Sequence, residues 1–205
     1  MRPTKAKGRL RKYRAILLFG APGSGKGTQG RILGSIPGFY GFSSGEAFRK
    51  LRPESELGRI FREYSNRGQL VPDEPTIRLW RESMEQARKE GRFNPKSDTL
   101  LLDGIPRNVN QARLLQARLD VRFVFYLSCP DMSKLVARLR RRAVIENRLD
   151  DANIDVIRER LETYDRETRP VLEFYGPKVV RRIDATQTPI GVLREILGFL
   201  AQGPP

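Results

Sequence analysis

Apolar residues gather in five short runs along the chain, at 15–19, 40–43, 99–103, 121–127 and 179–184. The first, third and fourth runs are apolar almost throughout, which is typical of strands that are buried on both faces of a parallel sheet. The other two runs are shorter or more mixed, but they have the same character. The pattern therefore predicts five strands.

Between the strands, apolar residues recur at steps of three and four, which is the period of one face of a helix. The clearest stripe comprises Ile154, Ile157, Leu161, Tyr164, Thr168, Val171 and Tyr175. We expect this stripe to face the core. Strands that alternate with helices form crossover units, with a mainly parallel sheet between two helical layers. The chain is therefore predicted to be an α/β protein with three layers and a central five-stranded parallel sheet.

Composition narrows the class of protein. A chain of 205 residues fits one domain, and its 39% hydrophobic and 31% charged residues are ordinary for a soluble protein. No apolar run approaches the roughly 20 residues of a membrane span. The single Cys129 cannot form an intramolecular disulfide, and the absence of histidine excludes the usual Cys/His zinc sites. We expect a cytoplasmic protein with no membrane span and no zinc.

The net charge of +15 indicates anionic partners, which include nucleotides, nucleic acids and membrane surfaces. Seven of the first fourteen residues are basic and none is acidic. We therefore expect residues 1–14 to form a disordered basic tail. Two interpretations of this tail stay open, a solvated leader and a weak contact with nucleic acid or another anionic surface.

The segment 20–28, with the sequence GAPGSGKGT, directly follows the first predicted strand and precedes a predicted helix. Its glycines let backbone amides approach an anion, the helix N-terminus adds partial positive charge, and Lys26 can reach the terminal phosphates of a nucleotide. The segment therefore predicts a phosphate loop that binds ATP.

One position of this loop is irregular. Phosphate loops usually have Ser or Thr directly after the lysine to bind magnesium, but here Gly27 is in that place and the hydroxyl comes at Thr28. Mg²⁺ would then be held by phosphates and water, with an acidic residue to orient the water. Asp103 is the candidate, because it ends a predicted strand at the edge where open α/β sheets bind ligands. The alternative is an aspartate that only caps a turn.

Five further segments follow the loop in the order found in the adenylate kinase family of nucleoside monophosphate kinases, which the chain resembles over nearly everything after the tail. They are Phe42–Arg49, Gly68–Glu74, Leu102–Arg107, Arg138 with Arg142, and Arg148–Asp151 with Arg160. Ile105 replaces the usual aromatic residue of the third segment. The resemblance implies a P-loop fold in which a kinase domain at 15–205 carries a helical NMP-binding insert at about 44–73. It also implies a short lid at about 143–147, a monomer, and a cis peptide bond before Pro106.

The resemblance also implies roles for individual residues. The implied ATP-binding residues are Gly23, Ser24, Gly25, Lys26, Gly27, Thr28 and Arg138. The implied monophosphate-binding residues are Ser44, Gly45, Arg49, Val71, Gly104, Arg107 and Gln111. The implied catalytic residues are Lys26, Arg107, Arg142, Arg148 and Arg160. Cationic side chains suit this role, because phosphoryl transfer depends on positioning and charge stabilisation more than on an acid or base.

Two positions bear on the acceptor of the phosphoryl group. The resemblance implies that both lie near the acceptor base, where Ser44 keeps a hydroxyl and Gln111 can both donate and accept, which suits the edge of adenine. Asn108, in contrast, is a residue seen in pyrimidine-type relatives. The favoured function is ATP + AMP = 2 ADP with Mg²⁺. The alternatives are a UMP/CMP-type kinase and a nucleotide-binding protein that also binds nucleic acid through its basic surface.

Overall fold

The computed structural model describes residues 12–203, and its centre is a five-stranded sheet in which every pairing is parallel. The strands are β1 (Tyr13–Phe19), β2 (Phe39–Ser43), β3 (Thr99–Asp103), β4 (Leu119–Ser128) and β5 (Val180–Asp184). Their order in the sheet is β2-β3-β1-β4-β5. The predicted sheet is confirmed, and all five predicted runs are strands.

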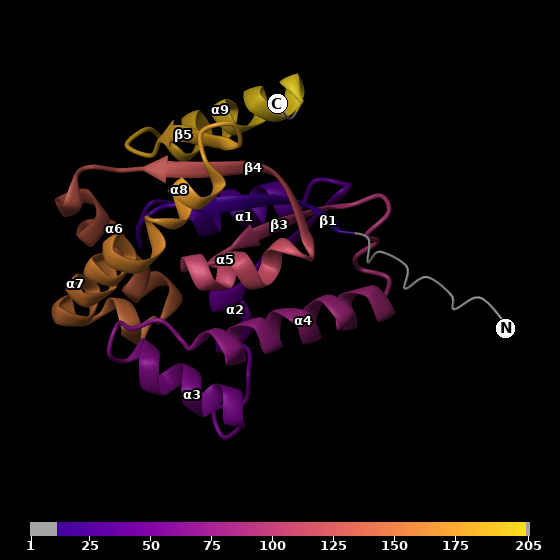
Figure 1. The fold of residues 1–205 in the computed structure, drawn as a ribbon. Helices are drawn as coiled ribbons and strands as arrows, with labels where there is room; N and C mark the ends of the chain where they lie inside the picture. The colour runs from indigo at the N-terminus through magenta and orange to yellow at the C-terminus, as the bar shows by residue number, and fades with distance from the viewer. Residues whose placement is uncertain (1–11, 204–205) are drawn as a thin grey trace, which may run out of the picture.

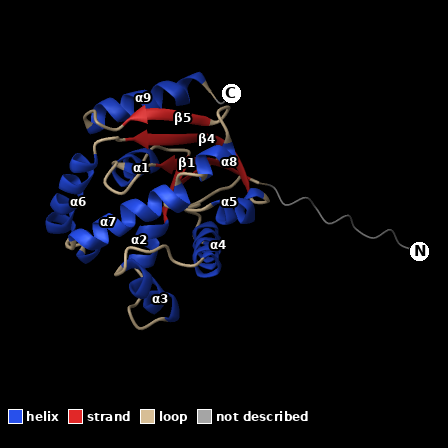
Figure 2. Cartoon of the chain, turned by 60° about the vertical axis from the view of Figure 1, so that its left-hand side comes forward, coloured by secondary structure: helices blue, strands red, loops and turns tan. Residues whose placement is uncertain are grey.

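Helices cover both faces of the sheet (Figure 1, Figure 2). They are α1 (Lys26–Gly34), α2 (Ser44–Arg49), α3 (Glu56–Ser65), α4 (Asp73–Lys89), α5 (Val109–Gln116), α6 (Met132–Glu146), α7 (Ile154–Thr163), α8 (Val171–Tyr175) and α9 (Pro189–Gln202). Apolar residues of α4, α5 and α8 pack on one face, and those of α1 and α9 pack on the other. In both views α3 lies at the opposite end of the molecule from α9.

The side chains of β1 point alternately to the two faces of the sheet, and each face is covered by a helical layer. Ala15, Leu17 and Phe19 join the core on the α4 side, whereas Ile16 and Leu18 join the core on the α1 side. All five side chains are at most 3% exposed. Successive side chains of a strand point to opposite faces, so a strand that is covered on both faces must be apolar at every position.

The predicted helical stripe is buried along most of its length, but it is not one helix. After α7 comes a π-helical turn at Tyr164–Thr168, and α8 begins only after Pro170. Proline has no backbone N–H and its ring clashes with the carbonyl four residues earlier, so the α-helix cannot continue through it. The π turn lets the stripe stay on the core side across this interruption, and Ile157 and Val171 are fully buried.

The first strand begins two residues earlier than predicted. The Tyr13 ring packs against Phe93 with centroids 5.3 Å apart, and the Arg14 guanidinium donates to the Ser97 carbonyl. Both residues also pair with β4, so residues 13 and 14 belong to the sheet and not to the tail. The rest of the predicted tail, except Lys12, lies outside the described residues.

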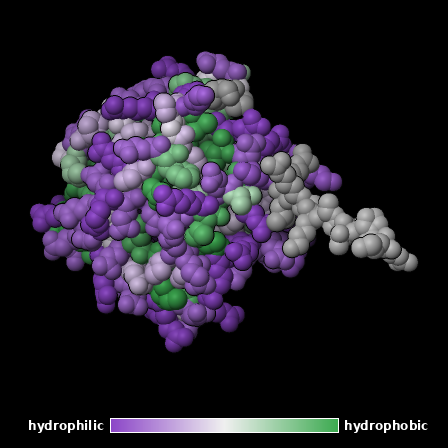
Figure 3. Space-filling view, viewed as in Figure 1, coloured by the Kyte–Doolittle hydropathy of each residue, from purple (hydrophilic) through white to green (hydrophobic). Residues whose placement is uncertain are grey.

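The exposed surface is mainly hydrophilic on the face that Figure 3 shows. Among residues 12–203, no helix is both long enough and apolar enough to cross a membrane.

Candidate active site

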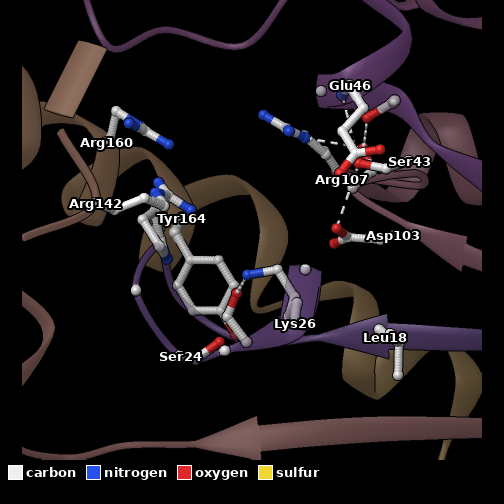
Figure 4. A pocket seen from close by; sticks show the side chains of 18 of the residues that line it. Leu18, Ser24, Lys26, Ser43, Glu46, Asp103, Arg107, Arg142, Arg160 and Tyr164 are labelled. Atoms are coloured by element: carbon white, nitrogen blue, oxygen red, sulfur yellow. Dashed lines mark hydrogen bonds between the residues drawn. The ribbon is translucent and has the colours of Figure 1, made fainter. Parts of the chain in front are cut away.

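A cavity of about 660 Å³ opens at the carboxyl end of the sheet. Its floor is the loop after β1, one wall comes from α2, α3 and the loop after β3, and the other comes from α6, α7 and the segment between them. Sticks in Figure 4 show side chains from these walls that point toward one another. The carboxyl edge of a parallel sheet is where ligands of open α/β folds bind.

Glycine is required where the loop turns under the cavity. At Gly23, φ is +84°, and an added Cβ would lie 2.8 Å from the Leu135 carbonyl oxygen. Gly25, with φ of +97°, precedes α1 and provides no side-chain cap. The first amide N–H groups of α1 are therefore free of a capping side chain and available for an anion.

Lys26 stands in the middle of the floor (Figure 4). Its ammonium donates to the carbonyl oxygens of Gly20, at 2.5 Å, and Ala21, at 3.0 Å. Burial, helped by nearby arginines and opposed by the attraction of the Asp103 carboxylate, lowers the Lys26 pKa from 10.5 to about 8. A bound phosphate would give the Lys26 ammonium a fully charged acceptor in place of these two neutral carbonyl oxygens.

Three arginines on the wall formed by α6 and α7 meet two carboxylates between the helices. Arg142 Nε lies 2.6 Å from Asp151 Oδ2, and Arg148 Nη2 and Arg160 Nη1 each lie 2.8 Å from Asp150 Oδ2. Arg160 also contacts Asp151, which is fully buried. Burial raises the Asp150 pKa, but the Arg148 hydrogen bond and the nearby positive charges outweigh it and bring the pKa to about 2.

Not every arginine donor in this wall has a partner. Among residues 12–203, the buried Arg142 Nη2 has no hydrogen-bond partner, and neither has the buried Ser24 Oγ of the loop below it. Orphaned polar atoms in a cavity rich in cations fit an anionic ligand that supplies the missing acceptor.

The opposite wall is built on backbone contacts of the loop after β3. The Gly104 carbonyl accepts from Arg107 Nε at 2.9 Å and from Ser44 Oγ at 2.6 Å. The Arg49 guanidinium lies over Gly45, where an added Cβ would be 3.1 Å from its Nη2. The peptide bond between Ile105 and Pro106 is cis, as predicted.

Asp103 ends β3 between these two walls. Within the described part of the chain, its Oδ2 accepts one long hydrogen bond of 3.4 Å from Ser43 Oγ, which leaves most of its acceptor capacity unused there. An added Cβ at Gly27 would lie 3.9 Å from the same oxygen, so glycine keeps this space clear. A carboxylate beside open space fits a magnesium ion that keeps several of its waters.

The structure brings all the predicted site residues to this one cavity, from Gly23 in the loop to Arg160 on α7. A model of the adenylate kinase family matches residues 18–180, which include both walls and the floor. The chain belongs to the adenylate kinase family.

Curated relatives agree with this membership. An adenylate kinase of Kocuria rhizophila is 36% identical over 90% of this chain and 97% of its own length. One from Azobacteroides pseudotrichonymphae is 35% identical over 89% of this chain and 88% of its own length. One from Micrococcus luteus is 39% identical over 83% of this chain and 82% of its own length.

In this adenylate kinase family member, one end of the cavity lies between α6 and the loop before α9. Arg138 Nη1 donates to the Ala185 carbonyl at 2.9 Å, and Gln29 Nε2 donates to the Pro189 carbonyl at 2.9 Å. Val192 completes the lining there. This end of the cavity combines apolar and cationic side chains, which suits the base of a nucleotide.

Sequence reasoning missed several lining residues. Glu46 lies inside the quoted segment 42–49, and an acid in a cation-rich motif was a signal that could have found it. Gln29 follows the loop and is 2% exposed, but burial of a glutamine is not readable from sequence. Tyr164 was assigned to the core and is 7% exposed, yet it also lines the cavity.

The short segment predicted as the lid, 143–147, has a simple structure. Residues 143–146 are the last turn of α6, and Asn147 ends the helix in a left-handed conformation with φ of 48°. Asparagine tolerates this conformation better than most residues. The chain therefore turns back within one residue and brings Arg148 toward the cavity.

Proposed function

We propose that the protein transfers the γ-phosphoryl group of ATP to AMP, producing two ADP. The observation that carries the proposal is the layout of one continuous cavity. Lys26 and five arginines form its cationic centre, Arg138 and Val192 lie at one end, and Ser44, Val71 and Gln111 line the other side. This layout suits two nucleotides that meet phosphate to phosphate.

The cationic centre can lower the activation barrier of phosphoryl transfer without a general acid or base. The attacking oxygen belongs to a phosphate whose second pKa is near 6, so it is already ionised at neutral pH. In our proposal Lys26 and the cleft arginines hold the phosphates in line and balance the charge of the transferring group. Arg107 and Arg49 hold the phosphate of AMP, and Arg142, Arg148 and Arg160 hold the transferring group.

Mg²⁺ fits the space beside Asp103, which would bind it through water. When bound, the ion neutralises charge on the β- and γ-phosphate oxygens of ATP. We propose that the insert at 44–73 and the segment at 143–147 close over the nucleotides, because exclusion of water protects ATP from hydrolysis.

The contacts of Asn108 support AMP as the acceptor. Its Oδ1 accepts from the Gln111 backbone N–H and its Nδ2 donates to the Asp73 carboxylate, both at 2.8 Å. Both ends of this side chain are therefore engaged at the start of α5, and Asn108 does not line the cavity, whereas Ser44 and Gln111 do. In our proposal Ser44 and Gln111 therefore face the acceptor base.

An acceptor panel with ATP and magnesium tests the proposal. Purified protein is given AMP, GMP, CMP or UMP, and ADP and free phosphate are measured separately. We expect AMP to give the highest kcat/KM, with two ADP formed for each AMP and little phosphate. Faster turnover of CMP or UMP would contradict the acceptor, and phosphate release without transfer would contradict the reaction.

A further inference from the structure

A carboxylate behind the proposed base site gathers three amide donors. Asp73, the first residue of α4, accepts from Asn108 Nδ2 at 2.8 Å, from Asn110 Nδ2 at 2.6 Å and from Gln111 Nε2 at 2.9 Å. Gln111 lines the cavity and is 1% exposed, whereas Asp73 does not line it. The carboxylate therefore reaches the cavity only through Gln111.

The two ends of the Gln111 amide have opposite partners. Its Nε2 donates to Asp73, and its Oε1 accepts from the Arg107 backbone N–H at 2.8 Å. A rotation of the amide by half a turn would place Oε1 against the carboxylate and NH₂ against the N–H. Both contacts would then be repulsive, so the amide has one orientation.

The Asp73 carboxylate is suited to hold that orientation at neutral pH. Burial raises its pKa, but the hydrogen bonds from Asn110, Asn108 and Gln111 outweigh burial, so the pKa lies below its ordinary value. An ionised carboxylate only accepts hydrogen bonds, and a hydrogen bond to a charged group is stronger than a neutral one.

With these two partners, the fixed amide has one N–H of Nε2 and one lone pair of Oε1 that no other described residue uses. Adenine presents an acceptor at N1 beside a donor at its 6-amino group, which matches this pair. A 6-oxo purine presents the reverse, an N–H donor beside a carbonyl acceptor. A 6-oxo purine would form both hydrogen bonds only if the Gln111 amide rotated by half a turn.

We infer that Asp73 is a positioning residue that makes the site select 6-amino over 6-oxo purines, by fixing the orientation of Gln111. This inference rests on the proposed function, in which Gln111 contacts the acceptor base. A site whose polar groups are fixed rejects a mismatched base, because the mismatch leaves buried groups unpaired.

The test compares AMP with IMP, which is the same size but carries a 6-oxo group. We expect Asp73→Ala to lower the ratio of kcat/KM for AMP to that for IMP by about tenfold or more, since one charge-assisted hydrogen bond no longer orients the amide. The ratio should fall mainly because the KM for AMP rises and the kcat/KM for IMP increases. Both rates come from one preparation, so partial unfolding cancels from the ratio.

The matched control is Asn110→Ala, which removes another donor to Asp73 but leaves Gln111 and Asn108 in place. We expect its ratio to stay within about twofold of wild type. If Asp73→Ala does not fold, Asp73→Ser replaces it, because a hydroxyl suits the first turn of a helix but is too short to hold both amides. The same loss of selectivity is expected.

An unchanged ratio in a folded Asp73 variant would overturn the inference, and so would an equal loss with both nucleotides, which indicates a purely structural role. Failure of the proposed function looks different, because wild-type protein would then not phosphorylate AMP at all.

Discussion

Lys26 shows at the residue scale how a binding site is built at the expense of stability. Its ammonium is partly buried and faces arginines, with two carbonyl oxygens as hydrogen-bond partners. A shift of its pKa from 10.5 to about 8 corresponds to at most about 3 to 4 kcal/mol, and water in the open cleft reduces this figure. The charge is therefore unfavourable until a phosphate binds.

Replacement of this lysine should separate activity from stability. We expect Lys26→Met to lose phosphoryl transfer by a factor of 10³ or more, because the central charge of the phosphate site is gone. We also expect the nucleotide-free variant to melt no lower than wild type, since the burial of the charge is relieved. Coupled ADP assays and thermal denaturation check the two parts. Normal activity in this variant would remove the loop from the mechanism.

The lowered pKa of Lys26 also predicts how nucleotide binding depends on pH. The protonated form binds phosphate and predominates below about pH 8 in the free protein. We therefore expect the Kd for ATP to be nearly constant below pH 8 and to rise above it, by up to tenfold per pH unit. Titration calorimetry from pH 6.5 to 9.5 measures this dependence.

The control for the pH dependence is Lys26→Arg, whose guanidinium stays charged throughout the range. Its Kd should show no break near pH 8. A break of equal size in this variant would assign the titration to another group, such as the terminal amine.

At the scale of elements, the short 3₁₀ turn Leu149–Asp151 is the centre of the arginine wall. It places two acidic side chains where Arg148 from the same segment, Arg142 from α6 and Arg160 from α7 converge. In the nucleotide-free protein these carboxylates balance the positive charges. The turn thus holds two helices together and keeps the arginines near the position of the phosphates.

The Asp150 contacts predict a contribution to stability that depends on pH. The pKa of Asp150 is about 2 in the folded protein and near 3.9 when unfolded, so its contribution is present above pH 4 and lost as the pH falls toward 2. We expect the free energy of unfolding of wild type to exceed that of Asp150→Asn by about 2 kcal/mol at pH 7. The difference should shrink at pH 3 in urea titrations.

The control for this element is Asp155→Asn, because Asp155 is exposed and, among residues 12–203, forms an ion pair only with exposed Arg158 at 3.4 Å. Exposed pairs contribute little, so this variant should differ from wild type by less than about 0.5 kcal/mol at either pH. A similar loss in both variants would mean that net charge, and not the buried cluster, determines the effect.

At the scale of the whole molecule, the sequence predicted the sheet and the placement of the site residues. Strands such as β1 and β3 are apolar at every inner position, and the site motifs follow the ends of strands, so both are readable from local pattern. The π turn before Pro170 and the network around Asp73 were not predicted. They depend on contacts between segments 35 or more residues apart or on how a helix adapts to a proline, and neither has a local pattern.

The start of β1 also determines how the basic N-terminus should be tested. A deletion of residues 1–14 would remove Tyr13 and Arg14, which belong to the sheet, so the deletion must end at residue 11. Deleting 1–11 removes five basic residues, Arg2, Lys5, Lys7, Arg9 and Arg11, and lowers the net charge from +15 to +10. We expect kcat and KM for AMP to stay within about twofold of the full chain, because the cavity lies at the opposite, carboxyl end of the strands.

The same pair of proteins distinguishes the two interpretations of these basic residues. Binding to single-stranded nucleic acid is measured by fluorescence anisotropy at 50 and 200 mM salt. Each phosphate contact contributes about 0.7 to the slope of log affinity against log salt on a single strand. A tail that contacts nucleic acid gives the full chain a steeper slope, by up to about 3.5 for five cations. Equal slopes would leave a solvated leader, with the remaining charge serving only the nucleotides.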